Sequence, residues 1–171
     1  MNVDISIDDK DWTAVTNLRK LARHTLKAAL ADDDVSLSLL FTSDARILEI
    51  NRKWRGKATA TNVLSFPIAA ETPVPAGEPK PLGDIVLAFG VVSREAMEQK
   101  KPITHHVTHL IVHGALHLLG YDHEEDSEAE AMEGREIAIL AGLGIENPYT
   151  SLVTKRHHRP CRSERASCGS L

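Results

Sequence analysis

The segment from Pro102 to Asp126 constrains the fold of this chain more than any other part of it. A helix turns about 100° per residue, and on that geometry the apolar residues gather on one side of the segment. His113 and His117, four residues apart, fall on the opposite side within about 6 Å of each other. The segment therefore predicts a helix that begins at Pro102 and ends before Gly120. Its packing face would consist of Val107, Leu110, Ile111, Gly114 and Leu118.

The same segment predicts a metal site. Gly120 tolerates the left-handed conformation that ends a helix, so the chain can turn and bring His123 back toward His113 and His117. Three neutral imidazoles are good ligands for Zn²⁺ and leave one position for water, the arrangement found at catalytic zinc. Zinc peptidases keep a glutamate base after the first histidine, whereas this chain has Gly114 there.

Other interpretations of the histidines stay open at this point. The chain has nine histidines, so the spacing can arise by chance. A structural zinc completed by a fourth ligand, such as Asp126 or a cysteine of the tail, is a second alternative. His105 lies about 12 Å along the helix from His113 and is a poor ligand candidate. His109, one turn before His113, can support a ligand, face a substrate or remain solvated.

The rest of the chain alternates between strand and helix patterns, and we expect an α+β domain of two layers with a mixed sheet of about four strands. The Pro-rich segment 69–83 indicates an exposed loop. One helix should be capped by Thr42, Ser43 or Asp44, turn Ile47, Ile50 and Trp54 inward, and end at Gly56. The expected strands are 3–7, 35–41, 62–68 and 84–89; the other expected helices are 12–31, 93–101 and 127–142.

Composition describes one ordinary globular domain, residues 1–150, followed by a basic tail, residues 151–171, that we expect to be disordered. Of the 171 residues, 42% are hydrophobic and 26% charged, and no apolar run is long enough for a membrane helix. The N-terminus lacks the features of a secretory signal, and both cysteines lie in the tail, so we expect a cytoplasmic protein. The net charge of −4 divides into +4 for residues 154–171, with five basic residues and one acidic, and −8 for the rest.

A local basic patch surrounds Trp54. Arg52, Lys53, Arg55 and Lys57 follow one another within six residues and could hold a phosphate backbone. A solvated basic helix end, favourable with the helix dipole, explains the same pattern equally well. Because Trp54 continues the stripe of Ile47 and Ile50, we interpret it as a core residue rather than a platform for base stacking.

The motif HLIVHGALHLLGYDHEED, with TNVLSFP and LGDIVLA upstream of it, resembles the YbeY family of bacterial rRNA maturation factors, and the resemblance covers roughly residues 1–150. The resemblance implies an α+β fold and a metal-dependent endoribonuclease directed at single strands, acting in small-subunit rRNA 3′ end maturation and ribosome quality control. It places the zinc ligands on His113, His117 and His123, and the family's arginine on Arg55. Asn62 stands where many members have aspartate, so no catalytic carboxylate is assigned there. The implied partners are rRNA precursors, the small ribosomal subunit and an assembly GTPase.

These residues suggest hydrolysis of an RNA phosphodiester, in which zinc activates water and Arg55 neutralises charge that builds up on the phosphate. A zinc peptidase would lack its base at Gly114. A ribosome-assembly factor without activity, stapled by a structural zinc, is the stronger rival. The tail could also bind a metal through His157, His158, Cys161 and Cys168, although contact of its arginines with RNA phosphates explains its composition better.

Overall fold

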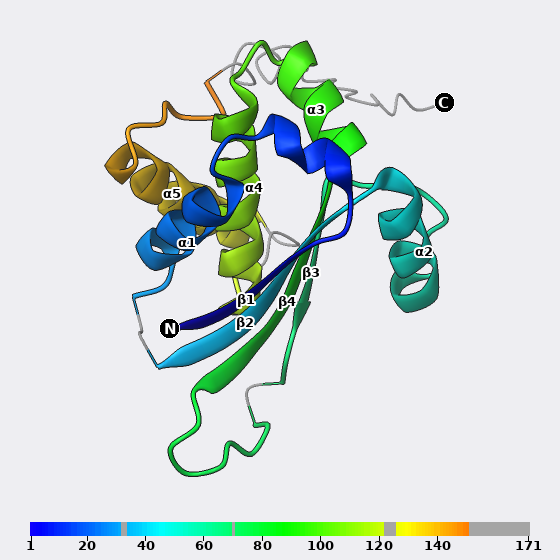
Figure 1. Cartoon of the computed structure of the whole chain (residues 1–171). Coiled ribbons are helices and arrows are strands. Elements are labelled where there is room, and N and C mark those ends of the chain that lie inside the picture. The colour runs from blue at the N-terminus through cyan, green and yellow to red at the C-terminus, as the bar shows by residue number, and fades with distance from the viewer. Residues whose placement is uncertain (32–33, 70, 122–125, 151–171) are drawn as a thin grey trace, which may run out of the picture.

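Four strands form one mixed sheet in the computed structural model, which describes residues 1–31, 34–69, 71–121 and 126–150 (Figure 1). The order across the sheet is β1-β2-β4-β3, with β1–β2 and β2–β4 parallel and β3–β4 antiparallel. This confirms the predicted α+β class and the mixed sheet of four strands. The elements are β1 (Asn2–Ile7), the 3₁₀ helix η1 (Lys10–Ala14), α1 (Leu18–Ala29), β2 (Val35–Thr42), α2 (Asp44–Arg55), β3 (Val63–Pro67), β4 (Lys80–Ala88), α3 (Phe89–Glu98), α4 (Ile103–Leu118) and α5 (Asp126–Gly142).

The main core lies on one face of the sheet, beneath α1, α4 and α5 (Figure 1). Successive side chains of a strand point to opposite faces, so alternate residues of β2 and β4 enter this core. Leu39 pairs with Ile5 on one side and Ile85 on the other, which places a row of buried apolar side chains across three strands. Ile111 and Leu116 of α4 are fully buried in the same core as these strand residues.

Helix α2 lies on the opposite face, where it forms a second, smaller core with β3 and β4 (Figure 1). Ile47 is fully buried there beside Leu64 and Val86. The prediction of two layers therefore describes most of the domain, but α2 adds a partial third layer along one side of the sheet. Asp4, Ser6 and Ser38 line a hollow on the same face.

The predicted helix 12–31 is interrupted. Trp12 belongs to η1, and α1 begins only at Leu18, after Asn17 has adopted a left-handed conformation with φ of 56°. Asparagine tolerates this conformation better than most residues. Trp12, Val15 and Leu18 are all buried, so the apolar spacing was read correctly although the backbone is not one continuous helix.

The predictions for α2 are confirmed at its ends but wrong at Trp54. The Ser43 hydroxyl accepts a hydrogen bond from the Arg46 backbone N–H, and Gly56 ends the helix with φ of 67°. Trp54, predicted to be a core residue, is 66% exposed. Burial falls along the stripe from Ile47 through the half-buried Ile50 to Trp54, because the second core covers only the first part of α2.

Other strand and helix predictions hold with shifted ends. Strand β4 begins earlier than predicted, at Lys80, and takes in the end of the Pro-rich segment; α3 begins at Phe89 rather than Ser93. In β1, Ile5 is buried and Val3 half-buried, but Ile7, predicted to face the core, is 37% exposed. None of the helices in the described ranges combines the length and the apolar character needed to cross a bilayer.

Candidate active site

Helix α4 packs on the sheet at Gly114. A Cβ atom at this position would lie 2.9 Å from Cγ2 of Ile85 and 3.1 Å from Oγ of Ser65, closer than van der Waals contact allows. The prediction that Gly114 serves close packing is therefore confirmed, and the packing face predicted for this helix is buried. No carboxylate can act from position 114, so the base of the zinc peptidases is absent there.

His113 and His117 lie on the other side of α4, as predicted. Their Nε2 atoms are 3.1 Å apart, and their rings meet edge to face with centroids 4.6 Å apart. Two nitrogens bound to one tetrahedral zinc, each at about 2.0–2.1 Å, are separated by roughly 3.3 Å. The two imidazoles are thus already placed close to the separation that a shared metal ion requires.

Glu136 of α5 holds the first histidine in orientation. Its Oε1 lies 2.7 Å from Nδ1 of His113, and its Oε2 lies 3.4 Å from Nε2 of His109 and accepts a hydrogen bond from the Tyr149 hydroxyl. Burial raises the pKa of this carboxyl, but the hydrogen bonds from His109, His113 and Tyr149 outweigh it and lower the pKa to about 2. An ionised Glu136 keeps the proton of His113 on Nδ1, which directs the lone pair of Nε2 toward His117.

Arg55 and the two histidines line one cleft, a cavity of about 710 Å³ between α4, β3 and the segment after α2. Arg55 stands at its edge, where Nη2 donates a 2.9 Å hydrogen bond to the Ser65 carbonyl and the guanidinium carbon lies 5.7 Å from the centre of the Phe66 ring. Lys57 lines the same cleft. The fold therefore brings together residues that are about sixty positions apart in the chain.

Asn62 also lines the cleft, and hydrogen bonds to two partly buried polar groups hold it in place. Its Nδ2 donates to the Glu95 carboxylate at 2.9 Å, and its Oδ1 accepts from the Val63 backbone N–H at 2.7 Å. The other partner of Glu95 is His106, 4% exposed, whose Nε2 lies 2.8 Å from Oε2. Asn62 thus presents a fixed amide, not a carboxylate.

Several predicted site residues lie outside the described part of the chain. His123, the predicted third ligand, is among them, as are Asp122, Glu124 and the tail with its histidines and cysteines. Within the described ranges, no cluster of three or more histidine, cysteine or acidic side chains is grouped to hold a metal ion. The three-histidine site therefore stays a prediction, of which the structure describes His113 and His117.

Glu136 and Tyr149 were missed by the sequence analysis. Met132, Glu136 and Leu140 recur four residues apart on α5 and are all at most 2% exposed, so a carboxylate interrupts an apolar stripe. Buried carboxylates are nearly always paired, and this interruption was the signal available in the sequence. Tyr149 lies beyond the last helix, and nothing in the sequence pattern points to its contact with Glu136.

The fold and the cleft define a class: an α+β fold with paired imidazoles and an arginine in one cleft, an arrangement suited to metal-assisted hydrolysis of a phosphodiester. Residues 4–144 match the profile of the family described as Endoribonuclease YbeY. The chain belongs to this family and is an enzyme, an endoribonuclease of the hydrolase class.

Proteins named Endoribonuclease YbeY from three bacteria are similar along most of their length. The one from Azorhizobium caulinodans is 48% identical over 155 residues, covering 87% of this chain and 96% of that protein. The one from Sinorhizobium fredii is 46% identical over 161 residues (87% and 92%), and the one from Chelativorans sp. is 48% identical over 151 residues (86% and 92%). The solution structure of TM1509 from Thermotoga maritima has the same fold, with a TM-score of 0.57 and 23% identity over 95% of this chain and 99% of that one.

Proposed function

We propose that the chain is a zinc-dependent endoribonuclease that cleaves single-stranded RNA in rRNA processing, namely small-subunit rRNA 3′ end maturation and ribosome quality control. The observation that supports this most is the shared cleft, in which Arg55 lines the same cavity as His113 and His117. A zinc ion that only stabilises the fold of an inactive assembly factor would need no such cavity beside its ligands. Family membership supports RNA as the substrate.

His113, His117 and His123 would hold the zinc ion. The 3.1 Å separation of the two described Nε2 atoms and the contact of His113 with Glu136 support this assignment, because metal-binding histidines commonly donate their other N–H to a carboxylate. When bound, such an ion supplies a Lewis acid that polarises a phosphoryl oxygen and lowers the pKa of water. Glu136 would keep the proton of His113 on Nδ1 and so preserve Nε2 for the metal.

Arg55 would bind the phosphate that is cleaved. Its guanidinium stays charged and offers several N–H donors in a planar fork, which matches the oxygens of a phosphate. The hydrogen bond to the Ser65 carbonyl uses one donor and fixes the side chain at the edge of the cleft. In hydrolysis the oxygen of water forms a new bond to phosphorus, the bond from phosphorus to one ribose oxygen breaks, and that oxygen takes up the proton that water releases. Arg55 would neutralise the negative charge that increases on the phosphate between these events.

The proposed partners are precursor rRNA, the small ribosomal subunit and an assembly GTPase, and the proposed location is the cytoplasm. RNA binding by a chain of net charge −4 requires a local concentration of positive charge. Arg52, Lys53, Arg55 and Lys57, all exposed at the end of α2 and just beyond it, provide this concentration beside the cleft.

Two substitutions test the proposal. Arg55→Ala should keep zinc at one ion per chain but reduce cleavage of single-stranded RNA by about 10²–10³-fold, the usual effect of removing one group that stabilises transition-state charge. His117→Ala should lose both zinc and cleavage. Arg23→Ala, which removes an exposed charge on α1, is the matched control and should change neither.

The assay should compare a single-stranded oligonucleotide with precursor small-subunit rRNA, with and without ribosomal particles. If the Arg55→Ala protein cleaves RNA at the wild-type rate, the arginine does not stabilise the charge on the phosphate. Activity that survives complete removal of metal would refute the zinc mechanism.

A further inference from the structure

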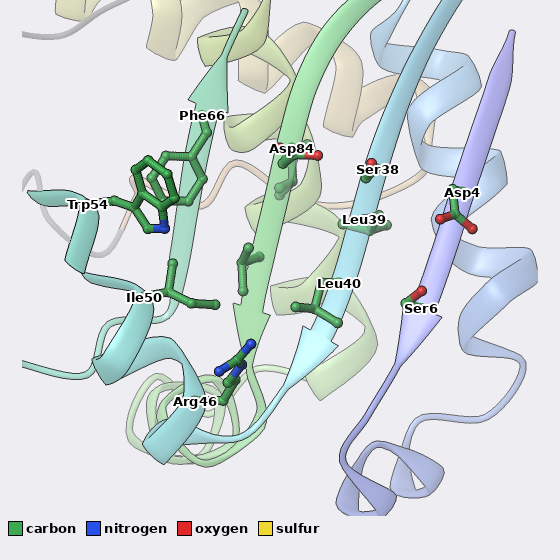
Figure 2. A pocket seen from close by; sticks show the side chains of 12 residues that line it. Asp4, Ser6, Ser38, Leu39, Leu40, Arg46, Ile50, Trp54, Phe66 and Asp84 are labelled. Carbon is green, nitrogen blue, oxygen red and sulfur yellow. The ribbon is translucent and has the colours of Figure 1, made fainter. Parts of the chain in front are cut away.

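A second hollow lies on the face of the sheet opposite to α4, between α2 and the strands. It has a volume of about 500 Å³ (Figure 2). Its apolar wall is formed by Leu40, Ile50, Trp54, Phe66 and Val86, and Arg46 lines it from the first turns of α2. It shares no lining residue with the histidine cleft.

Trp54 is unusual in its exposure. The other tryptophan, Trp12, is 1% exposed and donates from Nε1 to the Thr42 carbonyl at 2.9 Å, as a structural indole does. Trp54 is 66% exposed at the last turn of a regular helix and lies with Phe66 at one side of the hollow (Figure 2). The ammonium of Lys53 is 5.1 Å from the centre of its ring. A large aromatic ring held in solvent beside cations is the arrangement that stacks nucleic-acid bases.

Strand β3, the outermost strand of the sheet in the described part of the chain, contributes residues to both the hollow and the histidine cleft. Ser65 faces the cleft, and Phe66, the next residue, faces the hollow because side chains alternate along a strand. β3 is the outer strand of the sheet. Arg55 lies over this edge and touches both residues: it donates to the Ser65 carbonyl and lies against the Phe66 ring. A strand of RNA bound by Arg55 in the cleft is therefore next to the hollow.

Charges around the hollow fit one orientation of such a strand. Arg52, Lys53 and Arg55 occupy the last turn of α2, next to Trp54. Asp84 is paired with Phe66 across the two strands and is exposed, while Asp4 lies farther away on β1 (Figure 2). The α2 side would attract phosphates and the β4 side would repel them, while a carboxylate there could accept hydrogen bonds from base amino groups.

We propose that this hollow is a base-stacking subsite for single-stranded RNA. The strand leaves the histidine cleft, crosses the edge of β3 at Arg55, and places a base against Trp54 and Phe66 with its phosphates along the end of α2. This rests on the proposed cleavage of single-stranded RNA and adds the path of the substrate beyond the cleaved bond. Such a subsite would favour single strands over duplexes, since bases inside a duplex have no exposed face to stack.

The test compares two substrate lengths. An oligonucleotide of about twelve nucleotides, within the range that single-strand binding grooves contact, can place a base against Trp54, whereas a dinucleotide, whose single phosphodiester is the bond that is cleaved, has no further nucleotide to place there. Trp54→Ala should raise KM for the long substrate about tenfold with kcat unchanged, and should leave the short substrate unaffected. Trp54→Phe keeps a ring and should preserve most of the affinity. Met97→Ala, which removes a side chain that is 75% exposed on α3, is the control and should change nothing.

A second measurement uses the wild-type enzyme. Because Trp12 is buried, acrylamide quenches mainly the fluorescence of Trp54, and the long RNA should protect it. Unchanged quenching, or equal KM values for wild type and Trp54→Ala on both lengths, overturns the subsite. If Trp54→Ala instead loses binding of a ribosomal protein and keeps RNA affinity, the hollow is a protein-docking surface and the subsite is wrong. A wild-type enzyme that cleaves neither RNA refutes the proposed function itself.

Discussion

At the scale of single residues, the buried carboxylate of Glu136 organises the histidine side of α4. It is fully buried, yet it is ionised because His109, His113 and Tyr149 all direct hydrogen bonds to it. Whereas the pKa of Glu136 is lowered, the pKa of the Tyr149 hydroxyl is raised, first by burial and then by the neighbouring Glu136. The tyrosine therefore stays protonated and serves as a donor. This network connects the segment after α5 to the proposed metal site.

Glu136→Gln tests this role with little change in side-chain volume. The amide keeps one acceptor oxygen but loses the charge. His113 should therefore be less firmly oriented and less basic, and zinc affinity should fall by about 10–100-fold. Competition with a chromogenic chelator measures the affinity. Glu130→Gln, an exposed position on the same helix, is the control and should bind zinc like the wild type. Equal affinities for Glu136→Gln and wild type would show that Glu136 does not support the metal.

At the scale of elements, the contact between α4 and the sheet depends on Gly114. Gly114→Ala should destabilise the fold by about 1–3 kcal/mol, because the added methyl group meets Ile85 and Ser65 in a packed interior. Chemical denaturation measures the change in free energy of unfolding. Gly134→Ala on α5, where an added Cβ meets nothing within 4 Å, should be neutral or stabilising. A Gly114→Ala protein as stable as the wild type would mean that the two elements adjust without cost.

A hydrogen bond between Glu95 of α3 and His106 of α4 connects the two helices. Burial raises the pKa of Glu95, but hydrogen bonds from His106 and Asn62 outweigh it and the net shift is downward. A carboxyl with a lowered pKa in the folded state contributes stability above its ordinary pKa of about 4.3. That contribution is lost as the pH falls through the folded value.

Glu95→Gln should therefore be less stable than the wild type at neutral pH, and the difference should shrink as the pH falls below about 4.3. Thermal melts at a series of pH values measure it. Glu98→Gln, exposed on the same helix, is the control and should follow the wild-type profile. A constant difference between Glu95→Gln and wild type at all pH values would contradict the contribution of the charge.

The sequence pattern predicted the ends and the buried face of an element more accurately where its apolar stripe is buried along the whole length than where only part of the stripe is covered. Strand β2 and helix α4 were predicted nearly to their ends, because their apolar faces enter the main core. Trp54 was misplaced because periodicity gives the direction of a side chain, not whether another element covers it. The pairing of Glu136 with His113 depends on the packing of α5 against α4, which a local pattern does not specify. The contact of Arg55 with Ser65 likewise depends on tertiary structure.

At the scale of the whole molecule, the two faces of the sheet have different tasks. The face under α1, α4 and α5 supplies the core and the histidines, while the face beside α2 carries a hollow with exposed aromatic and charged side chains. Arg55 lies where the faces meet, at the edge of β3. Positive charge at this edge is local, because residues 1–153 together carry −8 and the last eighteen residues carry +4.

Deletion of residues 154–171 tests how this charge division affects RNA binding. An acidic body repels a phosphate backbone at long range, and the five basic residues of the tail offset that repulsion. The deleted chain should bind single-stranded RNA more weakly at low salt, and the difference should vanish as salt increases, because contacts with phosphates release counterions. Fluorescence anisotropy between about 50 and 200 mM salt measures how the RNA affinity of the full and of the shortened chain depends on salt concentration.

Arg55→Ala should instead impair cleavage at every salt concentration, since it acts at the cleaved bond. Equal affinities of the full and the shortened chain at low salt would show that the tail does not contribute to RNA binding and would leave the basic residues at the end of α2 as the binding surface.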